Sequence, residues 1–379
     1  DIFLLEIGMF FPLVIIATFP SLLENSFRLA ESFKNKAGDN IFAYKINMSY
    51  MQAQDWEANN MNAVDGTTSY NNAGGYDAIN RYGDEDTDGN LNDVTEDFNQ
   101  NYDTHPGLRK WHRTGYMEKE IVDYNTKNLK AQTSLHYMIF PETELIYSLN
   151  YSTGTTVYQG DNRFSLKDIE FWQNKLEIKK DNKFFIRAYR TQEDAGNSYD
   201  AVFTALRLQE YNQISNQDWY TAYKNNWRDN FSWEDINWST PTLEFNPITF
   251  ESEWIFNGSP ININDWMSMS DSVLNANTEL IISTHNNVRN LTDTELNRLI
   301  PGTDEFKSAL EDITSKIASD GGTGFYDKSA LKHMHSEYQF NPDIGTIKIG
   351  ANFRQYTPDT KGSLFIDTAN KIINNEIGI

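Results

Sequence analysis

Alternation of apolar and polar side chains over residues 128–191 constrains the fold of this chain more than any other feature. Four strands are predicted there, over residues 131–139, 145–151, 172–179 and 184–191. Successive side chains of a strand point to opposite faces, so each of these strands has one apolar and one polar face. Residues 141–143 and 180–183 are predicted to form tight turns. Between the two hairpins, a long polar loop is expected from Thr153 to about Asp168.

The same hairpin pattern recurs near both ends of the chain. Two more hairpins are predicted, residues 27–34 with 42–50 and residues 332–340 with 346–356. Their turns lie at residues 36–40 and 341–344, the latter with Pro342 at the second position that type I turns favour. The chain thus shows about eight strands of about ten residues each, close to the length of roughly 9–11 residues that crosses a bilayer at a tilt.

Short turns at one end of the strands and long excursions at the other are typical of outer-membrane β-barrels. We therefore expect an all-β fold: an incomplete, antiparallel transmembrane β-barrel segment with large extracellular loops that contain short helices. The two large excursions run over residues 53–127 and 191–330. In this arrangement the tight turns face the periplasm and the excursions face the outside of the cell.

The first excursion is polar, rich in Asn, Asp and Gly and expected to be mostly irregular, whereas the second is expected to contain some helix. Residues 217–228 place Trp219, Tyr220, Tyr223 and Trp227 at helical spacing. A second helix is predicted to begin at the capping box of residues 292–295. A third is predicted to be capped by Thr303 and to end at Gly321.

Residues 1–22 are left unassigned. Their apolar stretch, residues 9–20, is shorter than the roughly 18–20 residues that a membrane helix needs. It also lacks the basic segment of a signal peptide, so we expect a strand remnant or an end left by truncation rather than a signal sequence.

Composition excludes several classes of protein. With 54 acidic and 32 basic residues and a net charge of −22, the chain has no basic stripe to bind nucleic acid. It contains no cysteine, which argues against a small domain stapled by disulfides. A mean hydropathy of −0.62 excludes a helical membrane protein. It does not exclude a barrel, because only alternate strand residues face lipid.

Several segments, taken in order, resemble parts of one protein family. They are FAYKINMSYMQAQDWE (42–57), AINRYGDE (78–85), VDYNTKNLKAQTSLHY (122–137), GTTVYQGDNRFSLKDIEFWQNKLEIKK (154–180), KFFIRAYRTQEDAGNSYDAVFTALRLQ (183–209), GGTGFYDKSALKHMHSEYQF (321–340) and GANFRQYTPDTKGSLF (350–365). From about Asn25 to Ile379 the chain resembles the TonB-dependent outer-membrane receptors of Gram-negative bacteria, in their long-loop branch.

The resemblance implies a barrel of about 22 strands, closed by an N-terminal plug through which TonB delivers energy. Such a receptor lies in the outer membrane, contacts its lipid, binds an extracellular small molecule, peptide or glycan, and imports it. It is not an enzyme and requires no cofactor. The chain departs from this pattern, since we find no plug and no TonB-contacting segment. Residues 23–379 therefore resemble the middle of a barrel, cut at both ends.

Residues 84–90 resemble the first half of a calcium-binding loop. Oxygen ligands at alternate positions, followed by a glycine for the sharp turn, suit a hard cation such as Ca²⁺. The candidate ligands are Asp84, Asp86, Asp88, Asn90 and Asn92. Thr95 stands where such a loop has a bidentate glutamate, so a solvated acidic loop is the other interpretation.

His333, His335 and Glu337 alternate along a predicted strand and therefore share one face. Two imidazoles and a carboxylate suit Zn²⁺ or Fe²⁺. In a barrel, however, this is the lumen-facing side, where the two histidines are candidate contacts to a passing ligand. Arg187 and Arg190, near the end of another strand, are candidates to bind an anionic ligand or to pair with nearby carboxylates.

Six tryptophans lie in the second excursion, at positions 219, 227, 233, 238, 254 and 266. Aromatic rings stack on sugars and on flat ligands, so Trp219 and Trp227 are candidate ligand contacts. Large loops also need small cores of their own, and core packing is the favoured interpretation of these tryptophans.

A secreted or surface-attached all-β module that binds glycans is the alternative to a receptor. A barrel exposes its apolar strand faces to lipid, whereas a soluble sandwich packs them against each other. A glycoside hydrolase would need two carboxylates that converge in a cleft, and no pair stands out in the sequence.

Overall fold

The computed structural model describes residues 15–17, 22–85, 102–160 and 162–378. It divides into two compact units. We call the first the sheet unit, which comprises residues 1–57, 122–204 and 311–379. We call the second the helical unit, which comprises residues 58–121 and 205–310.

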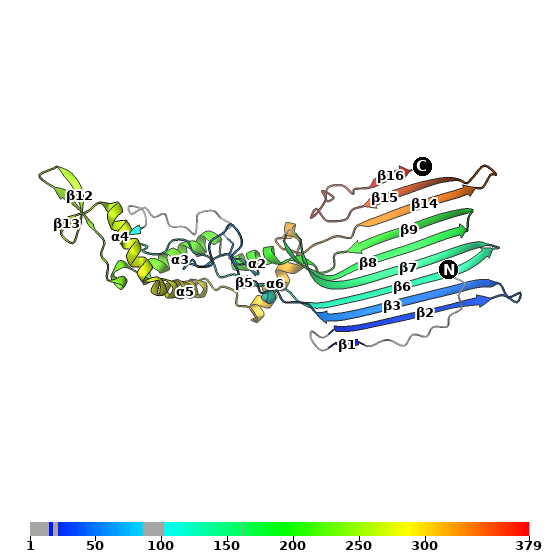
Figure 1. Ribbon diagram of the computed structural model, residues 1–379, viewed down its shortest axis with the longest axis horizontal. Coiled ribbons are helices and arrows are strands. Elements are labelled where there is room, and N and C mark those ends of the chain that lie inside the picture. The colour runs from blue at the N-terminus through cyan, green and yellow to red at the C-terminus, as the bar shows by residue number, and fades with distance from the viewer. Residues whose placement is uncertain (1–14, 18–21, 86–101, 161, 379) are drawn as a thin grey trace. The chain divides into compact units, whose positions relative to one another are not determined.

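An antiparallel sheet dominates the sheet unit (Figure 1). Its strands, in spatial order, are β1 (Ile15–Ala17), β2 (Leu22–Lys34), β3 (Asn40–Gln54), β6 (Asn125–Phe140), β7 (Thr143–Gln159), β8 (Arg163–Lys180), β9 (Phe184–Asp194), β14 (Ala330–Phe340), β15 (Ile347–Thr357) and β16 (Asn374–Gly378). The spatial order follows the order along the chain, so sequence neighbours pair. The short strand β10 (Tyr199–Asp200) also pairs with β8. Over the described residues the sheet is open, with β1 and β16 at its ends.

The four predicted hairpins are confirmed. They are β2–β3, β6–β7, β8–β9 and β14–β15. In the first turn, the side-chain oxygen of Asn35 accepts hydrogen bonds from the N–H groups of Ala37 and Asp39, both at 2.9 Å. Gly38, which lies between these two residues, has a φ of 92°, a conformation that costs a glycine little. The fold is therefore mostly antiparallel β-sheet, as the alternation predicts.

The long polar loop predicted over residues 153–168 is wrong. β7 and β8 continue through this segment and turn only after Gln159. Aromatic and β-branched residues favour the extended chain, and Tyr158 pairs with Phe164 near the tip. The register shifts after Gly154, so a bulge interrupts the alternation there. That interruption is why the sequence pattern suggested the end of a strand.

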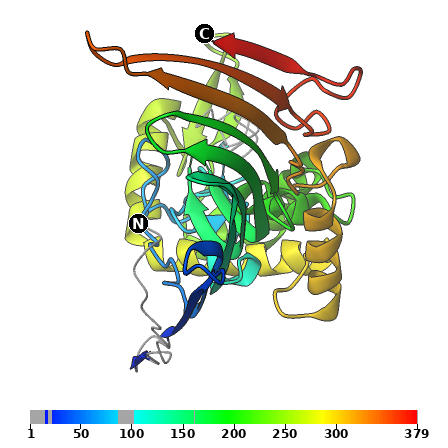
Figure 2. The ribbon, with the colours of Figure 1, turned by 90° about the vertical axis from the view of Figure 1, so that its right-hand side faces the viewer.

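The register sorts the side chains of the sheet onto two faces. Directly paired residues lie on the same face, so the register aligns rows of side chains across the strands. We call one face the apolar face; one of its rows is Phe33, Phe42, Tyr137, Leu145, Ile178 and Ile186. We call the other the polar face; one of its rows is Arg28, Asn47, Gln132, Asn150, Gln173 and Thr191. Figure 2 shows that the strands follow one another around a curved sheet.

In the rest of the described chain, irregular segments join short helices and small sheets. The helices are α1 (Glu118–Ile121), α2 (Ala201–Glu210), α3 (Asn216–Asn230), η3 (Trp233–Ile236), α4 (Ile263–Ala276), α5 (Thr278–Glu295), α6 (Asp304–Ser315) and η4 (Ala318–Asp320). The small sheets pair β4 (Arg81–Tyr82) with β5 (Tyr116–Met117), and β12 (Glu251–Phe256) with both β11 (Thr242–Asn246) and β13 (Ser259–Pro260). Among the described helices, none is long and apolar enough to cross a membrane.

Two of the three predicted helices are confirmed, the one over residues 217–228 as α3 and the one capped by Thr303 as α6. α3 begins after Ser215, whose side chain accepts the N–H of Asp218 in a capping box. α6 begins after Thr303, whose hydroxyl accepts the N–H of Phe306 at 3.2 Å. The predicted end of this helix at Gly321 is wrong, because α6 ends at Ser315 and Gly321 caps the separate turn η4. The capping box predicted at residues 292–295 is wrong, because these residues end α5. Thr292 is buried on the inner stripe of α5 and donates its hydroxyl to an earlier carbonyl of the same helix.

Aromatic side chains form the core of the helical unit. Its buried members include Tyr102, Trp111, Trp219, Tyr220, Tyr223, Trp227, Phe231, Trp233 and Trp266. They come from α3 and its C-terminal cap, from η3, from α4 and from residues 102–111 of the first excursion. The irregular first excursion therefore supplies aromatic residues to a core, although its composition is polar.

Candidate functional site

Charged side chains on the polar face of the sheet pair with one another. Glu177 on β8 is only 5% exposed. It accepts hydrogen bonds from Arg187 at 2.7 Å and from Lys175 at 3.0 Å. A buried carboxylate is costly unless it is paired and hydrogen-bonded. The two cations meet that requirement, so the polar face holds a charge away from bulk water.

Similar ion pairs continue across the polar face to the last strands of the sheet. They are His136 with Glu144 at 2.7 Å, Lys179 with Glu144 at 3.5 Å, Lys348 with Glu337 at 3.0 Å and Arg354 with Glu376 at 3.7 Å. All four of these ion pairs join residues on neighbouring strands. They therefore tie the strands together through side chains as well as through the backbone.

The structure brings three of the predicted site residues together on the polar face. His335 on β14 is the register partner of Arg187 on β9. The rings of His333 and His335 are stacked, with centroids 5.7 Å apart. Nδ1 of His333 lies 2.6 Å from the hydroxyl oxygen of Tyr189. Within the described part of the chain, no group of three or more His, Asp or Glu residues is placed to hold a metal ion.

Arg190 lies on the apolar face, away from Arg187. The two arginines are three residues apart on β9, and an odd separation in a strand places side chains on opposite faces. Arg190 donates a hydrogen bond to Gln192 at 2.9 Å. Arg187 binds Glu177 instead, which agrees with the ion-pairing interpretation for that residue. The two arginines therefore do not converge on one ligand.

A hollow of about 860 Å³ lies on the polar face of β2, β3 and β6–β9. Two neighbouring rows of side chains line it: Arg28, Asn47, Gln132, Asn150, Gln173 and Thr191, then Ser26, Ser49, Lys130, Ser152 and Phe171. The residues between the rows complete the lining: Phe27, Met48, Ala131, Tyr151 and Trp172. We call this site the polar hollow. Its volume lies within the range of about 300–1,000 Å³ that small-ligand sites occupy.

Sequence reasoning missed the polar hollow. Its amides are visible as polar residues on alternating strands, but they form a row only once the register of six strands is known. One local signal was available. Phe171 and Trp172 are adjacent in an alternating strand, so one of these rings must lie on the polar face.

Trp219 and Trp227, both predicted as candidate ligand contacts, lie in the core of the helical unit. They are 1% and 0% exposed. The indole N–H of Trp219 donates to Asp293 at 3.0 Å, and that of Trp227 donates to the carbonyl of Pro106 at 3.1 Å. Both rings contact other aromatic rings, so neither has a face free to stack on a ligand. This geometry agrees with the core-packing interpretation.

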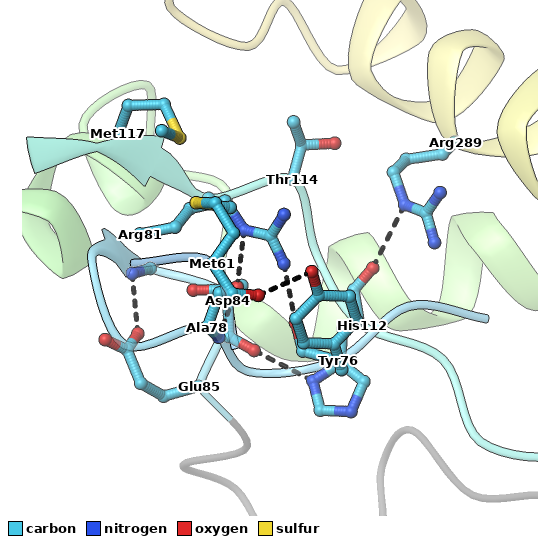
Figure 3. A network of polar contacts seen from close by, with 12 residues as sticks. Met61, Tyr76, Ala78, Arg81, Asp84, Glu85, His112, Thr114, Met117 and Arg289 are labelled. Carbon is cyan, nitrogen blue, oxygen red and sulfur yellow. Dashed lines mark hydrogen bonds and ion pairs between the residues drawn. The ribbon is translucent and has the colours of Figure 1, made fainter. Parts of the chain in front are cut away.

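Asp84, the first candidate calcium ligand, lies in a buried polar network of the helical unit (Figure 3). Its side chain is 0% exposed. One carboxylate oxygen accepts hydrogen bonds from Arg81 at 2.6 Å and from the N–H of Ala78 at 3.3 Å. Arg81 also donates to the carbonyl of Tyr76 at 2.7 Å. Nδ1 of His112 lies 2.9 Å from the backbone carbonyl oxygen of Asp84.

Burial raises the pKa of two adjacent carboxyl groups in this network. The pKa of Asp84 is raised to about 7 by burial, although the charge of Arg81 opposes the shift. The pKa of Glu85 is raised to about 8 by burial and by the neighbouring charge of Asp84. Glu85 also accepts the N–H of Gly83 at 2.6 Å (Figure 3). Both groups therefore exchange protons near neutral pH.

The remaining candidate calcium ligands lie outside the described residues: Asp86, Asp88, Asn90 and Asn92. One carboxylate oxygen of Asp84 is already held by the guanidinium of Arg81. The calcium site therefore stays a prediction from the sequence.

Three comparisons bear on the identity of the chain. No protein-family model matches it, and no curated protein and no solved structure matches it. The two faces of the sheet, together with the residues that line them, are therefore the observations from which a function is inferred.

Proposed function

We propose that this chain forms part of the wall of an outer-membrane receptor of the TonB-dependent type, which binds an extracellular ligand and imports it. In this proposal the apolar face of the sheet contacts lipid and the polar face borders water. One observation carries it: large apolar side chains are exposed in a belt along one face of the sheet, while the opposite face holds paired charges.

The exposed apolar side chains extend from β2 to β16. Each of the following has more than a third of its surface exposed: Phe27, Phe33, Met48, Leu135, Tyr137, Tyr147, Trp172, Leu176, Ile186, Met334, Phe353 and Ile377. Soluble monomers rarely expose contiguous apolar patches of more than a few hundred Å². A face of this extent is stable in contact with hydrocarbon, where exposure of apolar surface carries no cost of hydration.

The apolar side chains form a belt that runs obliquely to the rows of the register. The row that contains Ile46 on β3 is apolar there, but it continues on β9 and β14 as Arg190 and Lys332. On β14 and β15 the belt is displaced toward the tight turn, where Phe340 pairs with Ile347. Strands of a barrel tilt by about 35–45°. A belt parallel to the membrane must therefore cross such strands obliquely.

The polar face has the properties of a surface that lines water. It carries the ion pairs of Glu177, Glu144 and Glu337 and the amides of the polar hollow. In a soluble sandwich the apolar faces pack against each other and polar residues face outward. Here Glu177 and Ser148 on the polar face are buried, whereas Leu176 on the apolar face is 50% exposed. This contrast favours a barrel wall over a soluble glycan-binding module.

Import, and its energy supply from TonB through a plug, are supported by the sequence resemblance alone. The location in the outer membrane is supported both by the resemblance and by the two faces of the sheet. A membrane-insertion experiment therefore tests the part of the proposal that the structure supports.

The absence of cysteine from the chain allows a direct test. Single cysteines at Leu176 and Met334 report on the apolar face, and single cysteines at Ser134 and Ser152 report on the polar face. Each variant is labelled with an environment-sensitive fluorophore and reconstituted into phosphatidylcholine vesicles that contain a quencher attached to the lipid chains. We expect a blue shift and quenching at Leu176 and Met334 only.

Equal quenching at all four positions, or quenching at none, would contradict a lipid-facing sheet. Ser134 is matched to Leu176 in position along the strands, since it lies in the row that continues through Ser148 to Lys175, the residue next to Leu176. A difference between Leu176 and Ser134 therefore reports the face of the sheet rather than the position along the strand.

A further inference from the structure

The polar hollow differs in charge from the rest of the chain. The chain carries 54 acidic residues, yet no Asp or Glu is among the described residues that line the hollow. Two cations, Arg28 and Lys130, do line it. An excess of positive charge in the hollow favours an anionic occupant, because the two cations attract it and no lining carboxylate repels it.

The cations of the hollow are also free to bind that occupant. Elsewhere on the polar face, Arg187, Lys175 and Lys348 each pair with a carboxylate. Arg28 and Lys130 are exposed and make no ion pair within the described part of the chain. They lie on β2 and β6, with β3 between them. At about 4.8 Å per strand their backbones are about 10 Å apart across the sheet, a spacing that one extended ligand can bridge.

The amides of the hollow form a row of hydrogen-bonding groups that begins beside Arg28 and continues past Lys130 to β8. The side-chain N–H of Asn47 donates to Gln132 at 2.9 Å, and that of Asn150 donates to Gln173 at 3.0 Å. Gln173 in turn donates to the hydroxyl of Thr191 at 3.2 Å. These bonds fix the orientation of the amides. Each amide has two N–H donors and an oxygen with two lone pairs, so groups remain for the hydroxyls of a ligand.

Phe171 adds an aromatic surface to the hollow. Its ring is 44% exposed and lies on the polar face, as its pairing with Ser152 shows. An exposed aromatic ring beside amides and hydroxyls is a platform on which the apolar face of a sugar ring can stack. An acidic peptide would use the cations, but it has no comparable use for a ring set among amides.

We propose that the polar hollow binds an acidic oligosaccharide, one that carries uronic-acid carboxylates. Arg28 and Lys130 bind the carboxylates, the amide row binds the hydroxyls, and Phe171 stacks on a sugar ring. This proposal deepens the proposed function, because it names the class of ligand, and it rests on the polar face bordering water.

Isothermal titration calorimetry on the full chain in detergent micelles tests the proposal, with trigalacturonate as the probe. Maltotriose and triglutamate serve as the neutral sugar and the acidic peptide. We expect trigalacturonate to bind at least tenfold more tightly than either. The double variant Arg28→Gln/Lys130→Gln should weaken it at least tenfold, and Phe171→Ala should weaken it about tenfold.

A matched control removes the same charge from the same face outside the hollow, in the double variant Lys348→Gln/Arg354→Gln. It should change the affinity less than twofold. Equal losses in both double variants would overturn the proposal, as would equal binding of triglutamate or no binding of trigalacturonate. If the labelled chain inserts in vesicles but does not bind, only this ligand assignment fails. If it does not insert, the proposed function fails whatever the calorimetry shows.

Discussion

The substitution Leu176→Arg should lower the free energy of unfolding much more if the apolar face of the sheet contacts lipid than if it contacts water. On the apolar face of β8 the belt runs from Trp172 to Ile178, with Leu176 inside it. Six residues at about 3.3 Å each span about 20 Å of strand, or about 15 Å of depth at a tilt of about 40°. This lies within the apolar band of about 25 Å in transmembrane barrels. Leu176 is therefore expected inside the hydrocarbon region of the bilayer.

The expected magnitude differs between the two environments. At the bilayer midplane, Leu176→Arg should lower the free energy of unfolding by about 2–4 kcal/mol. In water, the leucine is already 50% exposed, and a surface substitution of this kind usually costs no more than about 0.5 kcal/mol. The gap of at least about 1.5 kcal/mol corresponds to more than a tenfold change in the equilibrium constant.

Urea unfolding from phosphatidylcholine vesicles, followed by far-ultraviolet circular dichroism, measures this cost. Ser134→Arg is the matched control, because Ser134 lies on the polar face in the row that continues through Ser148 to Lys175, the residue next to Leu176. It should lower the free energy of unfolding by less than about 1 kcal/mol. Equal costs for the two variants, within about 0.5 kcal/mol, would refute the assignment of the apolar face to lipid.

Three further predictions concern the helical unit. Trp227→Ala should destabilise it by about 3–5 kcal/mol in denaturant unfolding, because the ring is fully buried. The same change at Trp56, which is 85% exposed, should cost almost nothing, and similar losses at both would contradict the core assignment. Ser215→Ala should cost about 1 kcal/mol through loss of the α3 cap; an unchanged urea midpoint would contradict that role. The free energy of unfolding should fall as pH rises from about 4 through 8, because Asp84 and Glu85 keep protons in the folded state that the unfolded chain has lost. Replacing them by Asn and Gln should flatten the difference between midpoints at pH 5 and pH 8, and a difference that persists would rule out these two carboxyls as its source.

Local patterns in the sequence were sufficient to predict the hairpins. Strict alternation identified the strands around each tight turn, because each strand has one apolar and one polar face whatever its neighbours are. The pattern failed where a bulge at Gly154 changed the phase and hid the continuation of β7 and β8. It failed again at residues 292–295, because a capping box has the same residue types whether a helix starts or ends there.

The sites were harder to predict than the strands. The sequence placed His333 and His335 on one face correctly, since that needs only their spacing of two. Arg187 and Arg190 were grouped as candidates, although their spacing of three in a strand places their side chains on opposite faces of the sheet. Trp219 and Trp227 had helical spacing compatible with either core or ligand. The structure favours the core, because both rings are buried against residues 102–111, which are distant in the sequence.

By itself the sequence determined the strand pairs, their turns and the segregation of apolar from polar side chains, because these depend on residues close together along the chain. Tertiary structure decided the rows across the strands, and with them the polar hollow and the pairing of Glu177. Those features join residues from up to six strands whose register depends on backbone hydrogen bonds between distant segments. Whether a polar residue pairs with a charge or is left free for a ligand is settled only by its neighbours across the sheet. For that reason Arg28 and Lys130 looked ordinary in the sequence and became candidates for binding only in the folded sheet.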